Sequence, residues 1–190
     1  VTLVDVKANP IVEITPKGVR TTAGEHELDV IVFATGFVAM TGSLLKVDIR
    51  GRDGIALKDA WSAGPRTYLG LNVAGFPNLF TISGPGSPSV LTNMIVSIEQ
   101  HVNWIGECID WMRANKRRSI EATPQAQEEW VGHVNSVASG TLYPGCNSWY
   151  LGANVPGKTR VFMPLLGFPP YVERCKQVAA NGYEGFELRA

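Results

Sequence analysis

The first run of residues that could hold a ligand is Ala34-Thr35-Gly36, which follows the apolar segment Leu28–Phe33. That segment is rich in β-branched residues, which favours a strand buried on both faces of a parallel sheet. Open α/β sheets bind ligands at the carboxyl ends of such strands, where a glycine lets the backbone approach a cofactor closely. We therefore expect a cofactor contact at Thr35 and Gly36; a turn that merely ends the strand is the alternative.

The second run is rich in glycine and leads into a helix. The residues Gly84-Pro85-Gly86-Ser87-Pro88-Ser89 follow an expected strand at Leu79–Ser83, and a helical pattern begins at Asn93. The free N–H groups and positive dipole end of a helix N-terminus suit a polarised or anionic group, such as the edge of a flavin ring. Ser89 stands where the third glycine of a GxGxxG pattern would be, so the run does not predict pyrophosphate binding.

No other residues group into a catalytic site, and no metal site is expected. His26, His101 and His133 lack the Ser/His/Asp order, the paired carboxylates or the ligand spacing of such sites, so we expect structural roles for all three. The cysteines include no CxxC pair, which favours reduced structural thiols. Aromatic residues are most often part of a core, and four tryptophans are interpreted in this way: Trp61, Trp104, Trp111 and Trp130.

Length and composition restrict the class of protein. The 190 residues are 45% hydrophobic, which is enough apolar material for a packed core. The 17 basic residues balance 17 acidic ones, which argues against a nucleic-acid or anionic-membrane partner. No apolar run is long enough to span a bilayer and the start lacks a signal-peptide pattern, so we expect a soluble, cytoplasmic protein. Val1 begins what reads as a strand already in progress, which suggests a cut from a longer chain.

The elements that must position these runs begin with a β meander over residues 1–34. Apolar alternation predicts strands through Val1–Val6 and Ile11–Ile14, with turns at Pro16-Lys17-Gly18 and Ala23-Gly24-Glu25. The buried strand at Leu28–Phe33 would follow them.

Three helices are predicted in the second half of the chain. The longest spans Asn93–Asn115, and apolar residues at helical spacing mark its apolar face: Ile95, Ile98, Val102, Ile105, Ile109 and Met112. A second helix begins with Thr123 as N-cap and Pro124 at its first position, and a third spans Tyr171–Ala180. The segment 139–170 has no helical period and is too long for a simple connector, which is typical of a functional loop.

Longer runs carry a resemblance to a known family. Four of them resemble segments of Baeyer-Villiger monooxygenases of the cyclohexanone monooxygenase type: Gly64–Gly70, Gly84–Ser89, Asn93–His101 and Trp149–Lys158. The similarity covers essentially the whole chain and implies an α/β fold, namely the C-terminal part of a flavoprotein with Rossmann-like FAD and NADPH domains. Residues 1–34 would end the NADPH-binding domain with the meander and the crossover strand. Residues 35–190 would form the C-terminal part of the FAD-binding domain, with a helical layer and a mobile loop at about 139–160.

The resemblance also implies roles for single residues. The run Ala34-Thr35-Gly36 resembles the ATG motif of these flavoproteins, which lies where the chain crosses between the two nucleotide domains. This resemblance implies cofactor contacts at Thr35 and Gly36. Met94 matches a flavin-contacting position, and Trp149 matches the tryptophan of a mobile loop that folds over bound NADP. Four residues would line the substrate pocket: Ser89, Val90, Leu91 and Phe162.

The implied activity is the conversion of ketones, cyclic ones included, to esters or lactones with FAD, NADPH and O2, via a flavin peroxide. The family's catalytic residues lie upstream, so none is expected in this segment, and the N-terminal remainder of the same protein is the expected partner. Val38 stands where the family usually has an acidic residue, so one polar group near the crossover is lost.

Two alternatives to this activity stay open. Other two-domain flavin monooxygenases, which oxygenate nitrogen or sulfur, share the crossover pattern. A non-catalytic binding domain is the second alternative. We also expect the chain by itself to expose a large apolar face where the missing part of the FAD domain would pack.

Overall fold

The chain divides into two compact units, Val1–Phe37 and Val38–Ala190, and each is described by itself. The computed structural model describes residues 1–34, 38, 41–88, 92–146, 148, 151 and 167–190. Among the helices of these residues, none combines the length and the apolar content that crossing a bilayer requires.

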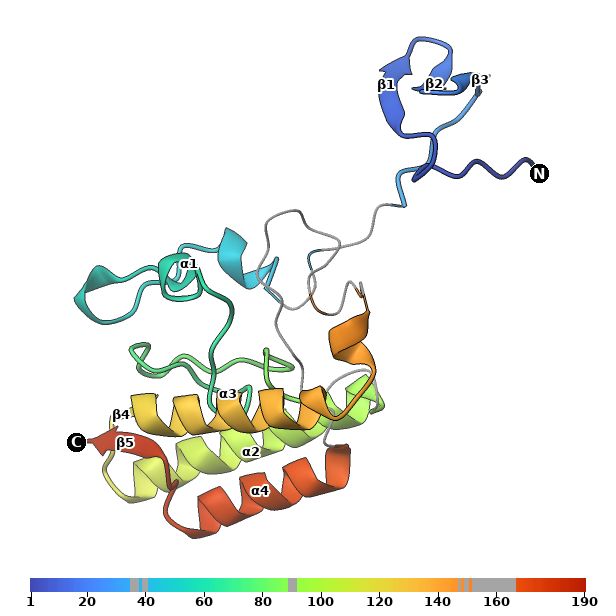
Figure 1. Ribbon diagram of the computed structural model, residues 1–190. Helices are drawn as coiled ribbons and strands as arrows, with labels where there is room; N and C mark the ends of the chain where they lie inside the picture. Colours follow the sequence, from blue (N-terminus) through green and yellow to red (C-terminus); the bar gives the residue numbers. More distant parts are fainter. Residues whose placement is uncertain (35–37, 39–40, 89–91, 147, 149–150, 152–166) are drawn as a thin grey trace. The chain divides into compact units, whose positions relative to one another are not determined.

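The first unit is an antiparallel meander of three strands, β1 (Ile11–Thr15), β2 (Gly18–Thr21) and β3 (Gly24–Glu27) (Figure 1). The two turns fall where the sequence predicts them. In the register of the sheet, Val19 of β2 pairs with Ile14 on one side and with His26 on the other. The predicted meander is thus confirmed for residues 11–27.

Two predicted strands of this unit do not form. Residues 1–6 and 28–33 have no strand conformation, and the side chains of Val30 and Val32 are 74% and 81% exposed. A strand is stable only when a neighbour supplies its hydrogen bonds and covers its apolar side chains. No strand within the described residues pairs with either segment, so the prediction of a buried parallel strand at Leu28–Phe33 is wrong for this chain.

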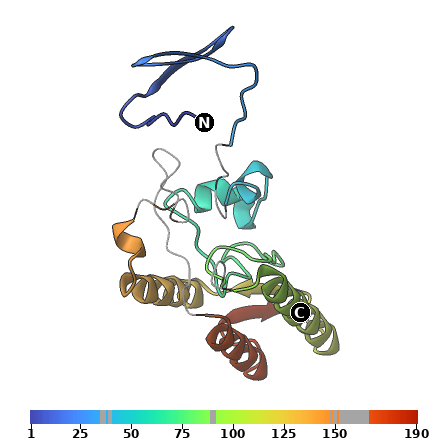
Figure 2. The ribbon, with the colours of Figure 1, turned by 90° about the vertical axis from the view of Figure 1, so that its right-hand side faces the viewer.

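The second unit is built on three helices, α2 (Met94–Ala114), α3 (Pro124–Ser139) and α4 (Phe168–Ala180), with the antiparallel pair β4 (Ser119–Ala122) and β5 (Phe186–Arg189) at one end of them (Figures 1 and 2). Shorter elements precede them: η1 (Leu44–Lys46), η2 (Arg52–Gly54) and α1 (Leu57–Ala60), and η3 (Tyr143–Gly145) follows α3.

The helix boundaries follow the capping signals in the sequence. The Asn93 side chain accepts a hydrogen bond from the Ile95 N–H at 3.0 Å, and the Thr123 hydroxyl accepts one from the Ala126 N–H at 3.1 Å. Both are N-caps, so the start of α2 and the start of α3 are confirmed. Helix α4 begins three residues earlier than expected, at Phe168. Its first turn contains prolines, which lack a backbone N–H, and the first turn of a helix tolerates them because its N–H groups make no hydrogen bond within the helix. The strand expected at Leu79–Ser83 is wrong: only an isolated bridge joins Phe80 to Asn72.

The buried face of α2 is not the apolar face marked by the sequence. Five residues at helical spacing are buried: Ser97, His101, Trp104, Cys108 and Met112. Most of the predicted apolar face is instead exposed, including Ile95 at 75% and Val102 at 48%. Both stripes repeat with the period of a helix, so periodicity alone cannot choose between them. The choice is made by Trp104, whose large side chain fills the main core, whereas Met112 belongs to both stripes.

The main core lies between the three helices and the β4–β5 pair. Trp104 and Trp130 are buried in it, and the Trp104 ring meets the Tyr183 ring edge-on with centroids 5.3 Å apart. A smaller core contains Trp61, and Trp111 packs against the main core, so the packing role expected for the tryptophans is confirmed. The three cysteines, Cys108, Cys146 and Cys175, are free thiols as expected.

Candidate functional site

The predicted site residues fall mostly outside the described residues. This holds for the expected cofactor contacts Thr35, Gly36 and Trp149 and for the expected pocket residues Ser89, Val90, Leu91 and Phe162. Met94 is described: it is the first residue of α2 and its side chain is 37% exposed. The candidate site is therefore built from the residues around the N-terminus of α2.

The glycine-rich turn before α2 is anchored to the core by hydrogen bonds. The Trp130 indole N–H donates to the Gly86 carbonyl at 2.9 Å, and the Thr67 hydroxyl donates to the Pro85 carbonyl. Within the turn, the Ser87 hydroxyl donates to the Gly84 carbonyl at 2.8 Å. Ser87 is fully buried, so the turn is a fixed part of the fold.

The glycines of this turn, and Gly70 next to it, allow neighbouring backbone segments to pack closely on each other. A Cβ at Gly84 would lie 2.4 Å from the Gly70 carbonyl oxygen, and a Cβ at Gly70 would lie 2.4 Å from the Ser87 nitrogen. Gly86 has a φ of 88°, and its Cβ would lie 2.8 Å from the Thr67 hydroxyl oxygen. At these positions the absence of a side chain lets neighbouring turns pack directly on the backbone.

Three buried hydroxyl groups beside the N-terminus of α2 find no hydrogen-bond partner among the described residues: the side chains of Ser83, Thr92 and Ser97. Ser83 precedes the glycine-rich turn, Thr92 precedes the N-cap of α2, and Ser97 lies in its first turn. Burying a hydroxyl without a partner costs free energy, so native proteins usually supply one. These groups, together with the N-terminal N–H groups of α2, suit a ligand with a polar edge.

His101, for which the sequence predicts a structural role, contacts the residue that precedes the glycine-rich turn. The imidazole is fully buried, its Nδ1 accepts from the Ser83 N–H at 3.0 Å, and its Nε2 lies 3.0 Å from the Tyr171 hydroxyl. Burial lowers the pKa of His101 to about 4. In the sequence, His101 has helical spacing with Ser97 and Trp104, and this spacing could have predicted that its side chain is buried. Its hydrogen-bond partners Ser83 and Tyr171 come from distant segments and could not be predicted.

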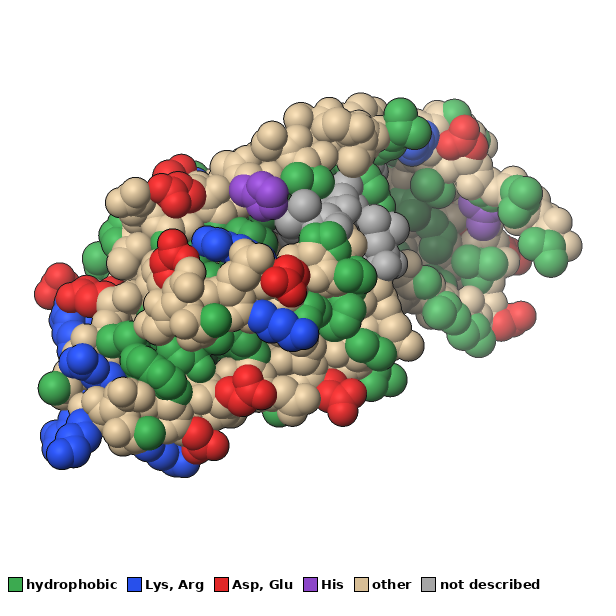
Figure 3. Space-filling view, turned by 90° about the horizontal axis from the view of Figure 1, so that it is seen from below, with side chains coloured by type: hydrophobic (Ala, Val, Ile, Leu, Met, Phe, Trp, Pro, Cys, Tyr) green, Lys and Arg blue, Asp and Glu red, His purple; other side chains and the backbone are tan. Residues whose placement is uncertain are grey.

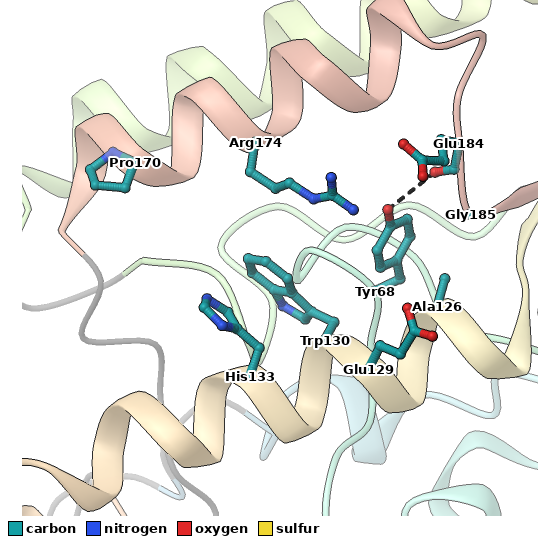
Figure 4. Close-up of a pocket in the computed structure, with 9 residues that line it drawn as sticks. All are labelled: Tyr68, Ala126, Glu129, Trp130, His133, Pro170, Arg174, Glu184 and Gly185. Atoms are coloured by element: carbon teal, nitrogen blue, oxygen red, sulfur yellow. Dashed lines mark hydrogen bonds between the residues drawn. The ribbon is translucent and has the colours of Figure 1, made fainter.

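A separate cavity of about 460 Å³ lies between α3 and α4 (Figure 4). Tyr68 and Trp130 form its wall, and the Tyr68 hydroxyl donates to the Glu184 carbonyl at 3.1 Å. Figure 4 shows the Arg174 side chain extending from α4 between these two rings. Burial raises the pKa of Tyr68, while the nearby Arg174 lowers it. Trp130 lines this cavity and also donates to the Gly86 carbonyl, so it connects the cavity wall to the glycine-rich turn.

Comparison with known proteins gives relatives over nearly the whole chain, although no family model matches. A Baeyer-Villiger monooxygenase of Pseudooceanicola batsensis is 45% identical over 96% of this chain and 34% of that protein. Cyclohexanone 1,2-monooxygenase of an Acinetobacter species is 43% identical over 100% of this chain and 35% of that protein. Phenazine N-monooxygenase of Lysobacter antibioticus is 42% identical with the same coverage. The chain thus spans about a third of the length of these relatives.

Solved structures agree with the sequence relatives. The closed crystal structure of cyclohexanone monooxygenase superposes with a TM-score of 0.94 at 46% identity, over 98% of this chain and 35% of that one. OTEMO in complex with FAD and NADP gives 0.91 at 43% identity, over 97% of this chain and 34% of that one. The predicted fold class, an α/β segment of a two-nucleotide flavoprotein, is confirmed.

Proposed function

Because the chain is homologous over nearly all its length to Baeyer-Villiger monooxygenases of the cyclohexanone monooxygenase type, we propose that it is the C-terminal part of such an enzyme. The whole enzyme would use FAD, NADPH and O2 to convert ketones, cyclic ones included, to esters or lactones. When bound, the flavin would supply the oxygen-transferring chemistry, and this chain would supply part of the flavin's binding site.

The homology carries the proposal, and the set of unpaired hydroxyls at the N-terminus of α2 supports a flavin contact there. Ser83, Thr92 and Ser97 are chemically suited to the carbonyl and N–H groups along the polar edge of a flavin, because a hydroxyl can both donate and accept. The positive end of the helix dipole would favour electron density on that edge. Met94 would contact the flavin from the first turn of α2.

The remaining cofactor and substrate contacts are proposed from the family resemblance. Thr35 and Gly36 would contact the cofactor at the domain crossover, and Trp149 would cover bound NADP. A closing loop of this kind excludes water, which the oxidation requires. Four residues would line the ketone pocket: Ser89, Val90, Leu91 and Phe162.

The exposed apolar stripe of α2 supports the N-terminal remainder of the protein as partner. We define this stripe by four side chains that are at least 36% exposed: Ile95, Ile98, Val102 and Ile109. Apolar side chains also reach the surface between charged ones on the face seen in Figure 3. An apolar stripe on the longest helix marks an interface, and the rest of the FAD-binding domain would cover it. The expected location of the whole enzyme is the cytoplasm.

N-oxygenation is the alternative activity that a specific observation favours, because one relative of similar identity is a phenazine N-monooxygenase. That protein and cyclohexanone 1,2-monooxygenase each align with the whole of this chain over about a third of their own lengths. The choice between substrates would therefore depend on the pocket residues named above and on the rest of the enzyme.

The test uses the full protein that carries this chain, purified with its flavin. Visible absorbance is recorded while NADPH and then a cyclic ketone are added under air, and the products are analysed by mass. We expect bleaching of the flavin bands, ketone-dependent consumption of NADPH and formation of a lactone. An aromatic N-heterocycle is tested in parallel with the ketone, as the substrate of the alternative activity. Its conversion to an N-oxide, with no product from any ketone, would move the assignment to N-oxygenation, and the absence of any flavin would contradict the enzyme proposal.

A further inference from the structure

We propose that His101 is a positioning residue: a neutral imidazole that fixes the backbone of Ser83 and thereby holds the glycine-rich turn against the N-terminus of α2. The role in shaping the turn stands on the contacts of His101 alone. Its consequence for cofactor binding rests on the function proposed above.

The hydrogen bonds around His101 determine which ring nitrogen carries the proton. The Ser83 N–H donates to Nδ1 at 3.0 Å, so Nδ1 has no hydrogen. The Tyr171 hydroxyl donates its one hydrogen to the Leu69 carbonyl at 2.9 Å, so its oxygen is free to accept. The Nε2–H of His101 therefore donates to the Tyr171 hydroxyl oxygen, 3.0 Å away. Each group has one possible role, and the imidazole is neutral.

This chain of hydrogen bonds holds two turns that are individually strained. Ser83 has a φ of 53° and Leu69 a φ of 58°, a left-handed conformation that side chains with a Cβ rarely adopt. His101 binds the backbone N–H of the first residue, and Tyr171 binds the carbonyl of the second. The two turns also pack directly on each other, since the Thr81 hydroxyl donates to the Gly70 carbonyl at 2.8 Å.

The position of Ser83 links this network to the candidate site. Its backbone N–H is held by His101, while its buried hydroxyl finds no partner among the described residues. Ser97, the second such hydroxyl, lies one helical turn before His101 on the same face of α2. His101 thus sets the place of a hydroxyl that would meet the cofactor, without contacting the cofactor itself.

Protonation of His101 would break the network. A second ring proton would place an N–H on Nδ1 against the Ser83 N–H, so two donors would face each other. Two titratable groups face this site from α4, Tyr171 and Cys175, and burial raises the pKa of both, so they stay neutral in acid. Among the described residues, the two turns present backbone groups and the hydroxyls of Thr81 and Ser83, and the Trp130 ring of α3 packs on the Tyr171 ring. The acid response of the turn therefore belongs to His101.

The test compares two variants of the full FAD-loaded protein, His101→Gln and His101→Leu. Glutamine can accept from the Ser83 N–H and donate to Tyr171 without titrating, whereas leucine can do neither. FAD release is followed by flavin fluorescence between pH 7 and pH 4. We expect wild type to lose FAD affinity as the pH falls toward 4, and His101→Gln to hold FAD at pH 7 and lose most of this pH dependence. His101→Leu should bind FAD about tenfold more weakly at every pH, as expected for one lost buried hydrogen bond.

A second measurement separates this proposal from the proposed function. The ¹⁵N chemical shifts of the His101 ring in the same protein report which nitrogen carries the proton, whether or not FAD binds. A protonated Nε2 and a bare Nδ1 at pH 7 support the positioning role. Protonation at Nδ1, or a His101→Gln variant with the same acid profile as wild type, would overturn it. A correct tautomer in a protein that binds no FAD would contradict the proposed function alone.

Discussion

The two apolar stripes of helix α2 differ in what surrounds them. One stripe, from Ser97 to Met112, is buried, although it contains a serine, a histidine and a cysteine. The other, from Ile95 to Ile109, consists of aliphatic residues and is exposed. The buried stripe is selected by shape and by hydrogen bonds to α4 and to the turns, while the aliphatic stripe has no partner within the described residues. The difference is consistent with the proposal that α2 packs on this unit with its buried stripe and on the rest of a larger enzyme with its exposed one.

The largest effect should come from the buried stripe. Trp104→Ala removes a ring that packs against Tyr183 and donates to the Cys175 carbonyl at 3.0 Å. We expect it to lower the free energy of unfolding by about 3–5 kcal/mol, because a large cavity forms in the main core. Urea unfolding followed by tryptophan fluorescence measures this. A loss below about 1 kcal/mol would mean that the core is not packed as described.

The next effect is the pH dependence of stability that His101 contributes. Its pKa is 6.5 in an unfolded chain and about 4 in the folded one, so the unfolded chain binds the proton more readily. The stabilisation is fully present above pH 6.5 and is lost progressively as the pH falls to about 4, by about 3 kcal/mol in total. Unfolding free energies of wild type and His101→Gln across this range check it. Equal slopes for the two proteins would contradict the assignment.

Ser97→Ala tests the unpaired hydroxyl on the buried stripe. Removing a buried polar group that has no partner should raise the stability of the chain without cofactor by about 1 kcal/mol. In the full protein the same change should weaken FAD binding, because the hydroxyl would lose its ligand partner. Thermal melts with and without FAD separate the two effects. Destabilisation in the absence of FAD would show that the hydroxyl already has a partner.

The smallest effect on stability is expected on the exposed stripe. Val102→Ser should change the free energy of unfolding of this chain by less than about 0.5 kcal/mol, because the side chain is already in water. The same variant should bind the N-terminal remainder of the protein more weakly than wild type, measured by co-purification of the two parts. Lys116→Ser, a change at a polar position just beyond α2, is the matched control. Unchanged association of Val102→Ser would argue against this stripe as the interface.

Local signals in the sequence were enough to predict part of the fold. The helix starts at Asn93 and Thr123 depend on a side chain and an N–H two or three residues away, so short sequence patterns contain them. The segment Leu28–Phe33 has the composition of a strand, but strand formation depends on a partner that no short pattern specifies. The same limit explains α2, whose two stripes have the same period and are distinguished only by what packs on them.

The candidate site was predictable only as a place along the chain. The glycine-rich turn followed by a helix N-terminus could be read directly from residues 84–93. The role of His101 could not, because Tyr171 is 70 residues away in sequence and the contacts arise only after α4 packs on α2. The close packing of Gly84 on Gly70 is hidden for the same reason, because the two residues are brought together only by the folded chain.

The central claim is that the N-terminus of α2 and the turn before it form part of a flavin site. Hydrogen–deuterium exchange of the full protein, compared with and without FAD, tests it most directly. The account predicts that FAD slows exchange of the backbone N–H groups over residues 83–88 and in the first turn of α2, and leaves β4 and β5 unchanged. Slowed exchange elsewhere, with none in these two segments, would contradict it.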